Sequence, residues 1–282
     1  MNRKKGDHDN SRDATFRYAE RLPHPSLTPW IAAYWEFSAQ VGAPPVHNVP
    51  PDGCTSLLIP TGGTHAGMLL YSGPWLIPLV VPVSPGHRFV GVRLRPGAAG
   101  IVLDVPVAQL RDATVPAALA GGAVGLVMQR ELAACVATDT DLDANARAFD
   151  AFWMRESRRF VRPDPLVSAV VDALVASHGE RLVSEIARAH GCTERTLLRR
   201  FRGATAMAPK QFARVRRLLA AAWHVVDGID QWGRIAAEAG YADHAHLHHE
   251  VKGLLGLRPE EFGAHIRRTA RDQVNRRIPG AP

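Results

Sequence analysis

The chain has 282 residues, close to the length at which one hydrophobic core gives way to two domains. Hydrophobic residues make up 46% and charged residues 22%, a globular composition that excludes an intrinsically disordered protein. The 3 cysteines lie far apart and show no CxxC spacing. This argues against a disulfide framework or a cysteine zinc site and favours a reducing compartment.

The apolar pattern argues against a secreted or membrane protein. Residues 1–15 carry charge but no apolar core of a signal peptide, and we expect them to form a disordered tail. The longest apolar stretch, 68–83, holds a serine, a glycine and 3 prolines, so it does not predict a membrane-spanning helix. We therefore expect a cytoplasmic protein with no membrane partner.

The formal net charge of +7 is concentrated in the second half of the chain. Residues 1–154 hold 12 Lys and Arg against 13 Asp and Glu, whereas residues 155–282 hold 22 against 14. Arginine supplies 20 of those 22 cations, and its planar fork suits phosphates and guanine edges. This asymmetry indicates that only the second half meets a polyanion, although a solvated basic surface explains the charge equally well.

Residues 16–118 predict a β-rich domain. Prolines are concentrated in the first half, with 15 of 21 in residues 1–154, and prolines or glycines interrupt the chain every few residues between 23 and 116. Short apolar runs lie between the breaks, and 89–94 alternates as a half-buried strand does. We interpret this domain as a candidate sensor of a small molecule.

Helical spacing begins after the β-rich region. Residues 119–162 predict two amphipathic helices, which would form either a linker packed on the first domain or a dimerisation segment. A domain boundary is expected near Arg162-Pro-Asp-Pro, where Asp164 can cap the next helix. The helical domain would extend over 163–270, followed by a tail over 271–282.

An internal repeat defines the basic half. Ile-Ala-x-x-x-Gly occurs at Ile186–Gly191 and again at Ile235–Gly240, 49 residues later. In each copy a short helix ends at glycine, and Thr193 or Asp243 can cap the helix that follows. Two such units predict two helix-turn-helix motifs, and the amphipathic helix expected over 209–226 would set them about one DNA turn, roughly 34 Å, apart.

The second helix of each unit supplies the candidate DNA contacts. The plain alternative is a helical bundle, but two copies in the arginine-rich half favour DNA. We expect Arg217 on the long helix to contact phosphate or to be a surface residue. The candidate recognition residues are Thr193, Arg195, Thr196, Arg199 and Arg200 in the first unit, and His244, His246, His248 and His249 in the second.

Residues 165–270 resemble the DNA-binding domain of AraC-type (AraC/XylS) transcriptional regulators. The resemblance implies an α+β chain, with a β-rich N-terminal domain and an all-α C-terminal domain of two helix-turn-helix units joined by a long helix. It also implies sequence-specific binding of double-stranded promoter DNA, contact with RNA polymerase in an activator, and no cofactor. The matching segments are Ser184-Glu-Ile-Ala, Thr193-x-Arg195-x-Leu197-x-Arg199-x-Phe201, Ala208-Pro209-x-x-Phe212, Ile235-Ala-x-x-Ala-Gly240-Tyr241-x-Asp243-x-x-His246-Leu247 and Gly256-Leu-x-Pro259-x-x-Phe262.

The chain departs from this family in the second recognition helix. The family usually has Gln at the position of His244, a basic residue at His249 and Phe at Val251. Four histidines predict either a weaker second unit or one that binds more tightly as pH falls. His244 and His248, spaced i and i+4, would suit a metal, but no acidic residue stands between them as in HExxH, and we expect no metal.

The first domain resembles the uncharacterised N-terminal domain of one AraC-type subgroup. Its candidate ligand-binding residues are Trp35, His47, Trp75 and Arg93, although aromatic residues at strand spacing also suit a core and arginines also suit a salt bridge. The matching segments are Leu22-Pro-His-Pro-x-Leu27, Trp30-Ile-x-x-Tyr34-Trp35, Pro50-Pro-Asp52-Gly53 and Val90-Gly-Val-Arg93-Leu-Arg-Pro96-Gly97.

The sequence does not predict an enzyme. It has no GxSxG, GxGxxG, P-loop or HExxH motif, and we name no catalytic residue. A small-molecule effector and a homodimer remain open as partners. The competing function is a module that binds a small ligand or a partner protein, with weakened DNA contact.

Overall fold

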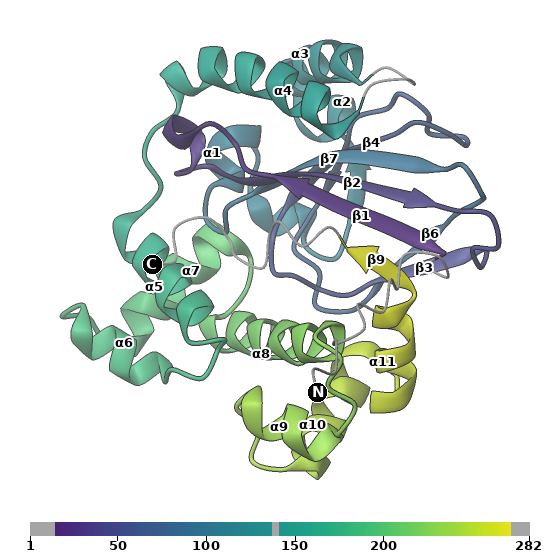
Figure 1. The fold of residues 1–282 in the computed structure, drawn as a ribbon. Coiled ribbons are helices and arrows are strands. Elements are labelled where there is room, and N and C mark those ends of the chain that lie inside the picture. The colour runs from purple at the N-terminus through teal and green to yellow at the C-terminus, as the bar shows by residue number, and fades with distance from the viewer. Residues whose placement is uncertain (1–14, 137–140, 272–282) are drawn as a thin grey trace, which may run out of the picture.

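The computed structural model describes residues 15–136 and 141–271, so the tails expected over 1–15 and 271–282 lie almost wholly outside the described residues. A β-rich region precedes a helical region, which confirms the predicted fold class (Figure 1). The strands are β1 Phe16–Arg21, β2 Ile31–Ala39, β3 Val46–Val49, β4 Ser56–Pro60, β5 Leu70–Ser72, β6 Leu79–Pro82, β7 Arg88–Leu94, β8 Thr114–Pro116 and β9 Thr269–Arg271. The α-helices are α1 Ala99–Leu103, α2 Ala117–Ala120, α3 Gly122–Cys135, α4 Leu142–Glu156, α5 Pro165–Ala176, α6 Val183–Ala189, α7 Glu194–Thr205, α8 Pro209–Val226, α9 Trp232–Glu238, α10 His244–Leu255 and α11 Pro259–Arg267, with 3-10 turns at Pro25–Leu27, Val107–Leu110 and Ser157–Arg159.

Seven strands form one sheet in the order β8-β5-β4-β7-β2-β1-β9, and β3 and β6 form a separate two-stranded ribbon. Most neighbours pair antiparallel, but β9 runs parallel to β1. The last strand of the helical region therefore completes the sheet of the first domain, a feature that the expected all-α C-terminal domain did not include. β9 could not be predicted from the sequence, because it has only 3 residues and they show no alternating apolar pattern.

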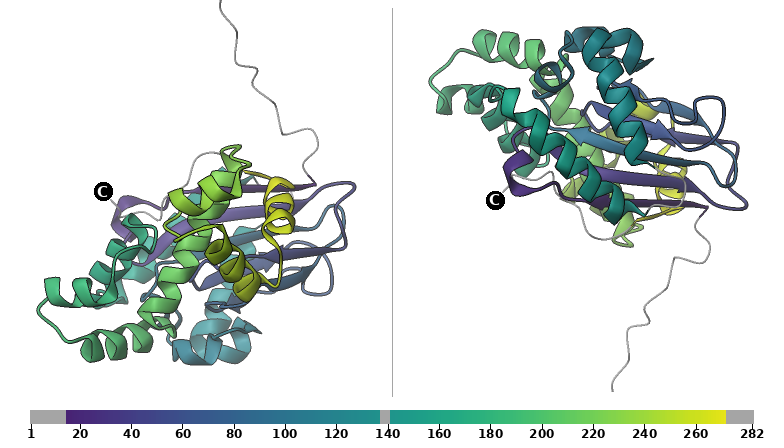
Figure 2. Two further views of the ribbon diagram at one scale, coloured as in Figure 1. Left: turned by 90° about the horizontal axis from the view of Figure 1, so that it is seen from below. Right: turned by 90° about the horizontal axis from the view of Figure 1, so that it is seen from above.

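One face of the sheet is covered by α3 and α4 (Figures 1 and 2). Their apolar sides enter the same core as the strands, with Met128, Phe149 and Trp153 completely or almost completely buried. Tyr34 of β2 donates a 2.8 Å hydrogen bond to Asp150 of α4. The apolar faces that would suit a dimer thus pack on the first domain of the same chain.

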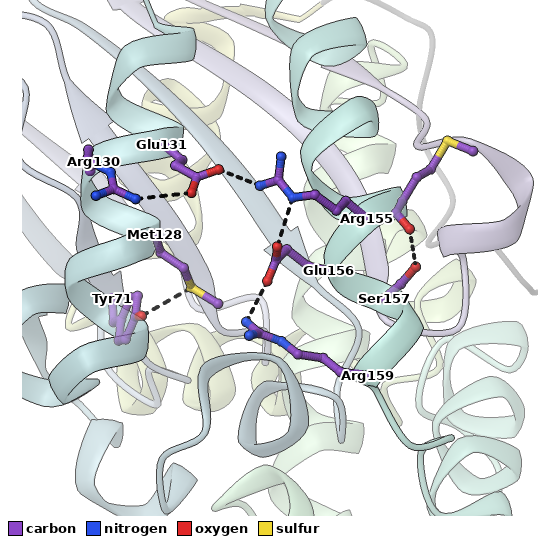
Figure 3. A network of polar contacts seen from close by, with 9 residues as sticks. Tyr71, Met128, Arg130, Glu131, Arg155, Glu156, Ser157 and Arg159 are labelled. Carbon is purple, nitrogen blue, oxygen red and sulfur yellow. Dashed lines mark hydrogen bonds and ion pairs between the residues drawn. The ribbon is translucent and has the colours of Figure 1, made fainter.

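Salt bridges join α3 to α4. Arg155 pairs with Glu131 of α3 and, at 3.1 Å, with Glu156, which also accepts from Arg159 at 2.7 Å (Figure 3). These partly exposed pairs lie on the outer side of the two helices and add little free energy beyond the apolar packing.

The opposite face of the sheet lies toward α8 and α11 (Figures 1 and 2). Two helical cores share α8: Phe212 belongs to the core of α5–α7, and Leu218 and Val225 to that of α9–α11. With 18 residues and a rise of 1.5 Å per residue, α8 is about 27 Å long. No helix in the described part of the chain has the length and apolar character needed to cross a membrane.

The two domains meet in close contacts. Arg95 pairs with Asp172 of α5 at 2.5 Å, and the indole of Trp30 donates to the carbonyl of Val161 at 2.8 Å. Gly53, in the loop before β4, has a φ of +75°, and a Cβ there would lie 2.6 Å from the ring of Phe212. Glycine is required at this position for both its backbone conformation and its size.

Gly53→Ala should therefore destabilise the protein by about 1–3 kcal/mol more than Gly42→Ala, as urea unfolding would measure. Gly42 is a matched control, because its φ of +86° is also left-handed but no atom lies within 4 Å of an added Cβ. Both variants carry the backbone strain, and only Gly53→Ala carries the clash with Phe212. Equal losses in the two variants would contradict this account of the interface.

Candidate nucleic-acid interface

The first helix-turn-helix unit consists of α6, a turn at Gly191 and α7. Gly191 has a φ of +61°, which allows the chain to turn sharply after α6. Thr193 caps α7 by accepting a 3.2 Å hydrogen bond from the N–H of Thr196. Leu197 and Phe201 are buried, so the opposite side of α7 faces outward.

The outward side of α7 carries a stripe of arginines. Arg195, Arg199 and Arg202 are exposed and follow the i, i+4, i+7 spacing of one helix face. None of these three side chains has a hydrogen-bond or ion-pair partner within residues 15–136 and 141–271. Arg202 was missed in the sequence prediction, although its spacing from Arg195 was the available signal.

Arg200, by contrast, is held within the protein. Its Nε and Nη2 atoms donate to the two carboxylate oxygens of Asp164 at 2.7 and 2.5 Å. Asp164 also caps α5 through the N–H of Leu166 at 2.9 Å. These hydrogen bonds join α7 to the start of α5, and the hydrogen bond from Arg200 is the main cause that lowers the pKa of Asp164.

The second unit repeats this plan. Gly240 has a φ of +71° between α9 and α10, and Asp243 caps α10 by accepting from the N–H of His246 at 2.7 Å. Leu247 is buried in the core of α9–α11. Arg214 of α8 donates to Glu250 of α10 at 2.8 Å, so an arginine–carboxylate pair holds this recognition helix as well.

The other arginines of α8 are hydrogen-bonded within the protein or buried. Arg217, expected to contact phosphate, donates to the carbonyl of Gly179 at 2.9 Å and lies over the ring of Tyr241. Arg216 is only 7% exposed. Of α7 and α8, only α7 therefore presents exposed arginines without a partner among the described residues.

The four histidines of α10 have different surroundings. His244 and His249 are exposed and His248 is half-buried, with the His244 and His248 rings 6.4 Å apart. The Nδ1 atom of His246 instead accepts from the N–H of Ala242 at 3.3 Å, and its ring packs edge-on against Tyr241. Among the described residues, no three His, Cys, Asp or Glu side chains are grouped as a metal site.

The candidate ligand residues of the first domain are not brought together in one cavity. Arg93 pairs with Glu20 and, at 3.0 Å, with Asp52. His47 lies in the β3–β6 ribbon and stacks on Phe37 with ring centroids 4.4 Å apart. Trp35 lies over Gly91 in the sheet, whereas Trp75 donates to Ser72 at 3.0 Å in the turn after β5.

A cavity of about 250 Å³ lies elsewhere, between the ribbon and the second helix-turn-helix unit. Ile77 and Val80 line it on the ribbon side, and Leu255, Leu257 and His265 line it on the helical side. None of the four candidate ligand residues is among its lining residues. Sequence patterns did not reveal it because its two walls lie far apart in the chain.

The Asp164–Arg200 pair makes stability depend on pH. Because the pKa of Asp164 is lowered in the folded state, the stabilisation is fully present above the usual value of 3.8 and is lost as pH falls through the folded-state value. Asp164→Asn keeps a capping side chain and removes the charge. Urea unfolding should show the variant less stable than wild type at pH 7, with the difference shrinking as pH falls below the usual carboxyl value of 3.8. A difference that persists in acid would contradict this role.

Two family models match the chain. Residues 19–116 match the domain of unknown function DUF6597, and residues 186–265 match the family described as a helix-turn-helix domain. No curated protein matches the chain.

Solved structures of bacterial proteins show a distant similarity. ToxT from Vibrio cholerae O395, bound to (E)-4-(8-methylnaphthalen-1-yl)but-3-enoic acid, is 11% identical, with a TM-score of 0.47 over 90% of this chain and 100% of that chain. An apo ToxT variant from Vibrio cholerae strain SCE256 is 10% identical, with a TM-score of 0.47 over 78% and 93%. The C-terminal domain of AraT, a response regulator from Geobacillus stearothermophilus, is 15% identical, with a TM-score of 0.34 over 40% and 93%.

The two matched segments cover most of the sheet and both capped recognition helices. They show that this protein carries a domain of the DUF6597 family over residues 19–116 and a helix-turn-helix domain over residues 186–265.

Proposed function

We propose that the chain binds promoter DNA with α7 in one major groove and α10 in the next. The observation that carries this proposal is the unpaired arginine stripe of α7, formed by Arg195, Arg199 and Arg202. Guanidinium groups on the N-terminal part of a recognition helix reach guanine edges, and those farther along reach phosphates. Arg195 and Arg199 therefore read bases, while Arg202 contacts the backbone.

Residues that the protein already engages have other roles in this proposal. Arg200 orients α7 through its hydrogen bonds to Asp164. Thr193 caps α7 by accepting a hydrogen bond from the N–H of Thr196. His244, His248 and His249 form the outward surface of α10. The length of α8, about 27 Å, supports a separation of the two recognition helices close to one DNA turn, roughly 34 Å.

The wider organisation follows from this function. Residues 16–118 form the sensor domain, and 119–162 connect it to the DNA-binding domain over 163–270. The protein acts in the cytoplasm, and it acts as a regulator rather than as an enzyme. A homodimer would use a surface other than the buried faces of α3 and α4, and Leu119 and Leu126 are exposed on the outer side of α2 and α3. An activator would also contact RNA polymerase.

A small apolar effector is the second part of the proposal, and the 250 Å³ cavity favours it. Its walls come from the β3–β6 ribbon and from α10–α11, so a bound molecule would contact both domains at once. A ligand that prefers one arrangement of the domains shifts the population toward it. Binding here would thereby change how the second unit meets DNA.

Arg199→Ala should cost about 1–3 kcal/mol on a duplex selected from a randomised pool and should relax preference at one base pair. Fluorescence anisotropy against selected and scrambled duplexes at matched salt measures both effects. Arg130→Ala is the control, because Arg130 is an exposed arginine on α3, outside the helix-turn-helix domain. An equal loss on both duplexes would assign Arg199 to phosphate rather than to a base.

The cavity can be tested with the apolar dye 8-anilinonaphthalene-1-sulfonate. Its fluorescence should rise with wild-type protein and should fall several-fold in Ile77→Glu, which places a charge among the apolar lining. Val41→Glu is the matched control, because Val41 is 92% exposed and does not line the cavity. Equal dye binding by both variants would remove the cavity as an effector site.

A further inference from the structure

The two recognition helices present different kinds of cation. The stripe on α7 consists of arginines, which stay charged at every physiological pH. The outward positions of α10 before its last turn carry imidazoles instead, at His244, His248 and His249. Imidazole is the side chain whose charge changes between pH 5 and pH 8. The charge of the second recognition helix therefore depends on pH, whereas that of the first does not.

Most charged groups on the neighbouring elements pair with one another, and none of them pairs with these histidines among the described residues. Glu250 of α10 pairs with Arg214 of α8, and Lys252 lies in the last turn of α10. No carboxylate pairs with any of the four histidines in the described part of the chain. Asp243 caps α10. The other pairs on the neighbouring elements are Arg234 and His224 with Glu238, Arg258 with Glu261, and Arg267 with Asp230. The remaining groups are the exposed Glu260 and His265, both on α11.

A proton gained by these histidines therefore adds uncompensated positive charge to the surface of α10. With ring centroids 6.4 Å apart, His244 and His248 repel each other when both are protonated in the free protein. Double-stranded DNA carries one negative charge per about 1.7 Å of its axis and offsets that repulsion. Protonation is thus more favourable on DNA than in the free protein.

His246 is set apart by its hydrogen bond. Its Nδ1 atom accepts from the N–H of Ala242 and must stay unprotonated to do so, while its ring packs edge-on against Tyr241. Protonation at Nδ1 would break this contact at the start of α10. His246 is accordingly a positioning residue rather than a proton-linked DNA contact.

We propose that α10 binds DNA by taking up protons on His244, His248 and His249, so that the second unit engages as pH falls from 8 to 6 while the first unit binds throughout. This inference rests on the proposed function and adds regulation to it. The sign follows from linkage: since the DNA-bound state holds more protons, affinity rises as pH falls. Each histidine that goes from neutral to charged on binding contributes up to one proton.

The full chain would be titrated by anisotropy against one duplex, selected from a randomised pool by this protein, at constant ionic strength between pH 8.0 and pH 6.0. The dissociation constant should fall at least about tenfold over this range, since two or more linked histidines contribute. The variant His244→Gln/His248→Gln/His249→Gln keeps helix-forming, hydrogen-bonding side chains and should lose this dependence. At pH 8.0 it should bind within about threefold of wild type, because glutamine, like a neutral imidazole, can both donate and accept a hydrogen bond.

Two further variants separate linkage from structure. His65→Gln changes an exposed histidine in a loop of the first domain and should keep the full pH dependence. His249→Gln alone, at an exposed position, should remove about one third of the dependence of affinity on pH. This single variant replaces the triple variant in the test if circular dichroism shows that the triple variant is unfolded. His246→Gln should weaken binding by a similar factor at both pH values.

The outcomes are distinct. Binding that is independent of pH, or a triple variant with the wild-type slope, would overturn the proton-linked role and leave the proposed function intact. Failure to bind any duplex at pH 8.0 and pH 6.0 would overturn the proposed function and this inference with it. A slope lost in the triple variant but kept in His65→Gln would support the inference.

Discussion

Both recognition helices are oriented by one helix, α8, whose two halves belong to two hydrophobic cores. Phe212 anchors the first half beneath α7, and Leu218 and Val225 anchor the second half beneath α10 and α11. A continuous helix has no hinge, so burial of these side chains fixes the separation of the two units. The first domain is tied to the same helix, because Gly53 lies against Phe212 and β9 returns to the sheet. A change at the domain interface therefore acts on both units through a single rigid element.

The interface also contains buried charge. Burial lowers the pKa of Arg216 on α8, and its Nε atom has no hydrogen-bond partner among the described residues. Across the interface, burial opposes the charge of Arg93, but Glu20, Tyr18 and Asp52 outweigh it and raise the pKa of Arg93. A buried guanidinium without full hydrogen bonding destabilises the contact that buries it. The favourable apolar contact between Gly53 and Phe212 is therefore offset in part by the buried guanidinium of Arg216.

The sequence predicted those elements whose signals are local. The helix expected over 209–226 is α8, and Thr193, Asp164 and Asp243 cap the helices that their positions indicated, because a cap and an i, i+4 apolar pair involve only a few neighbouring residues. Partners far along the chain were not predictable. Arg200 pairs with Asp164 across a separation of 36 residues, and Arg93 pairs with Glu20 across a separation of 73 residues. The cavity lies between the ribbon and α10–α11. Helix and strand propensities and the spacing of apolar residues carry no information on such contacts, which depend on how the helices and strands pack together.

The two ion pairs that hold the recognition helices matter for direction more than for stability. Arg200–Asp164 and Arg214–Glu250 are partly exposed on the arginine side, and pairs of that kind contribute little free energy. Leu197, Phe201, Leu247 and Val251 supply the apolar burial that holds α7 and α10 in place. Apolar burial is not directional, whereas a hydrogen-bonded arginine fork has one preferred geometry. Since base recognition depends on the direction of each side chain, these pairs connect the fold to the specificity of the two units.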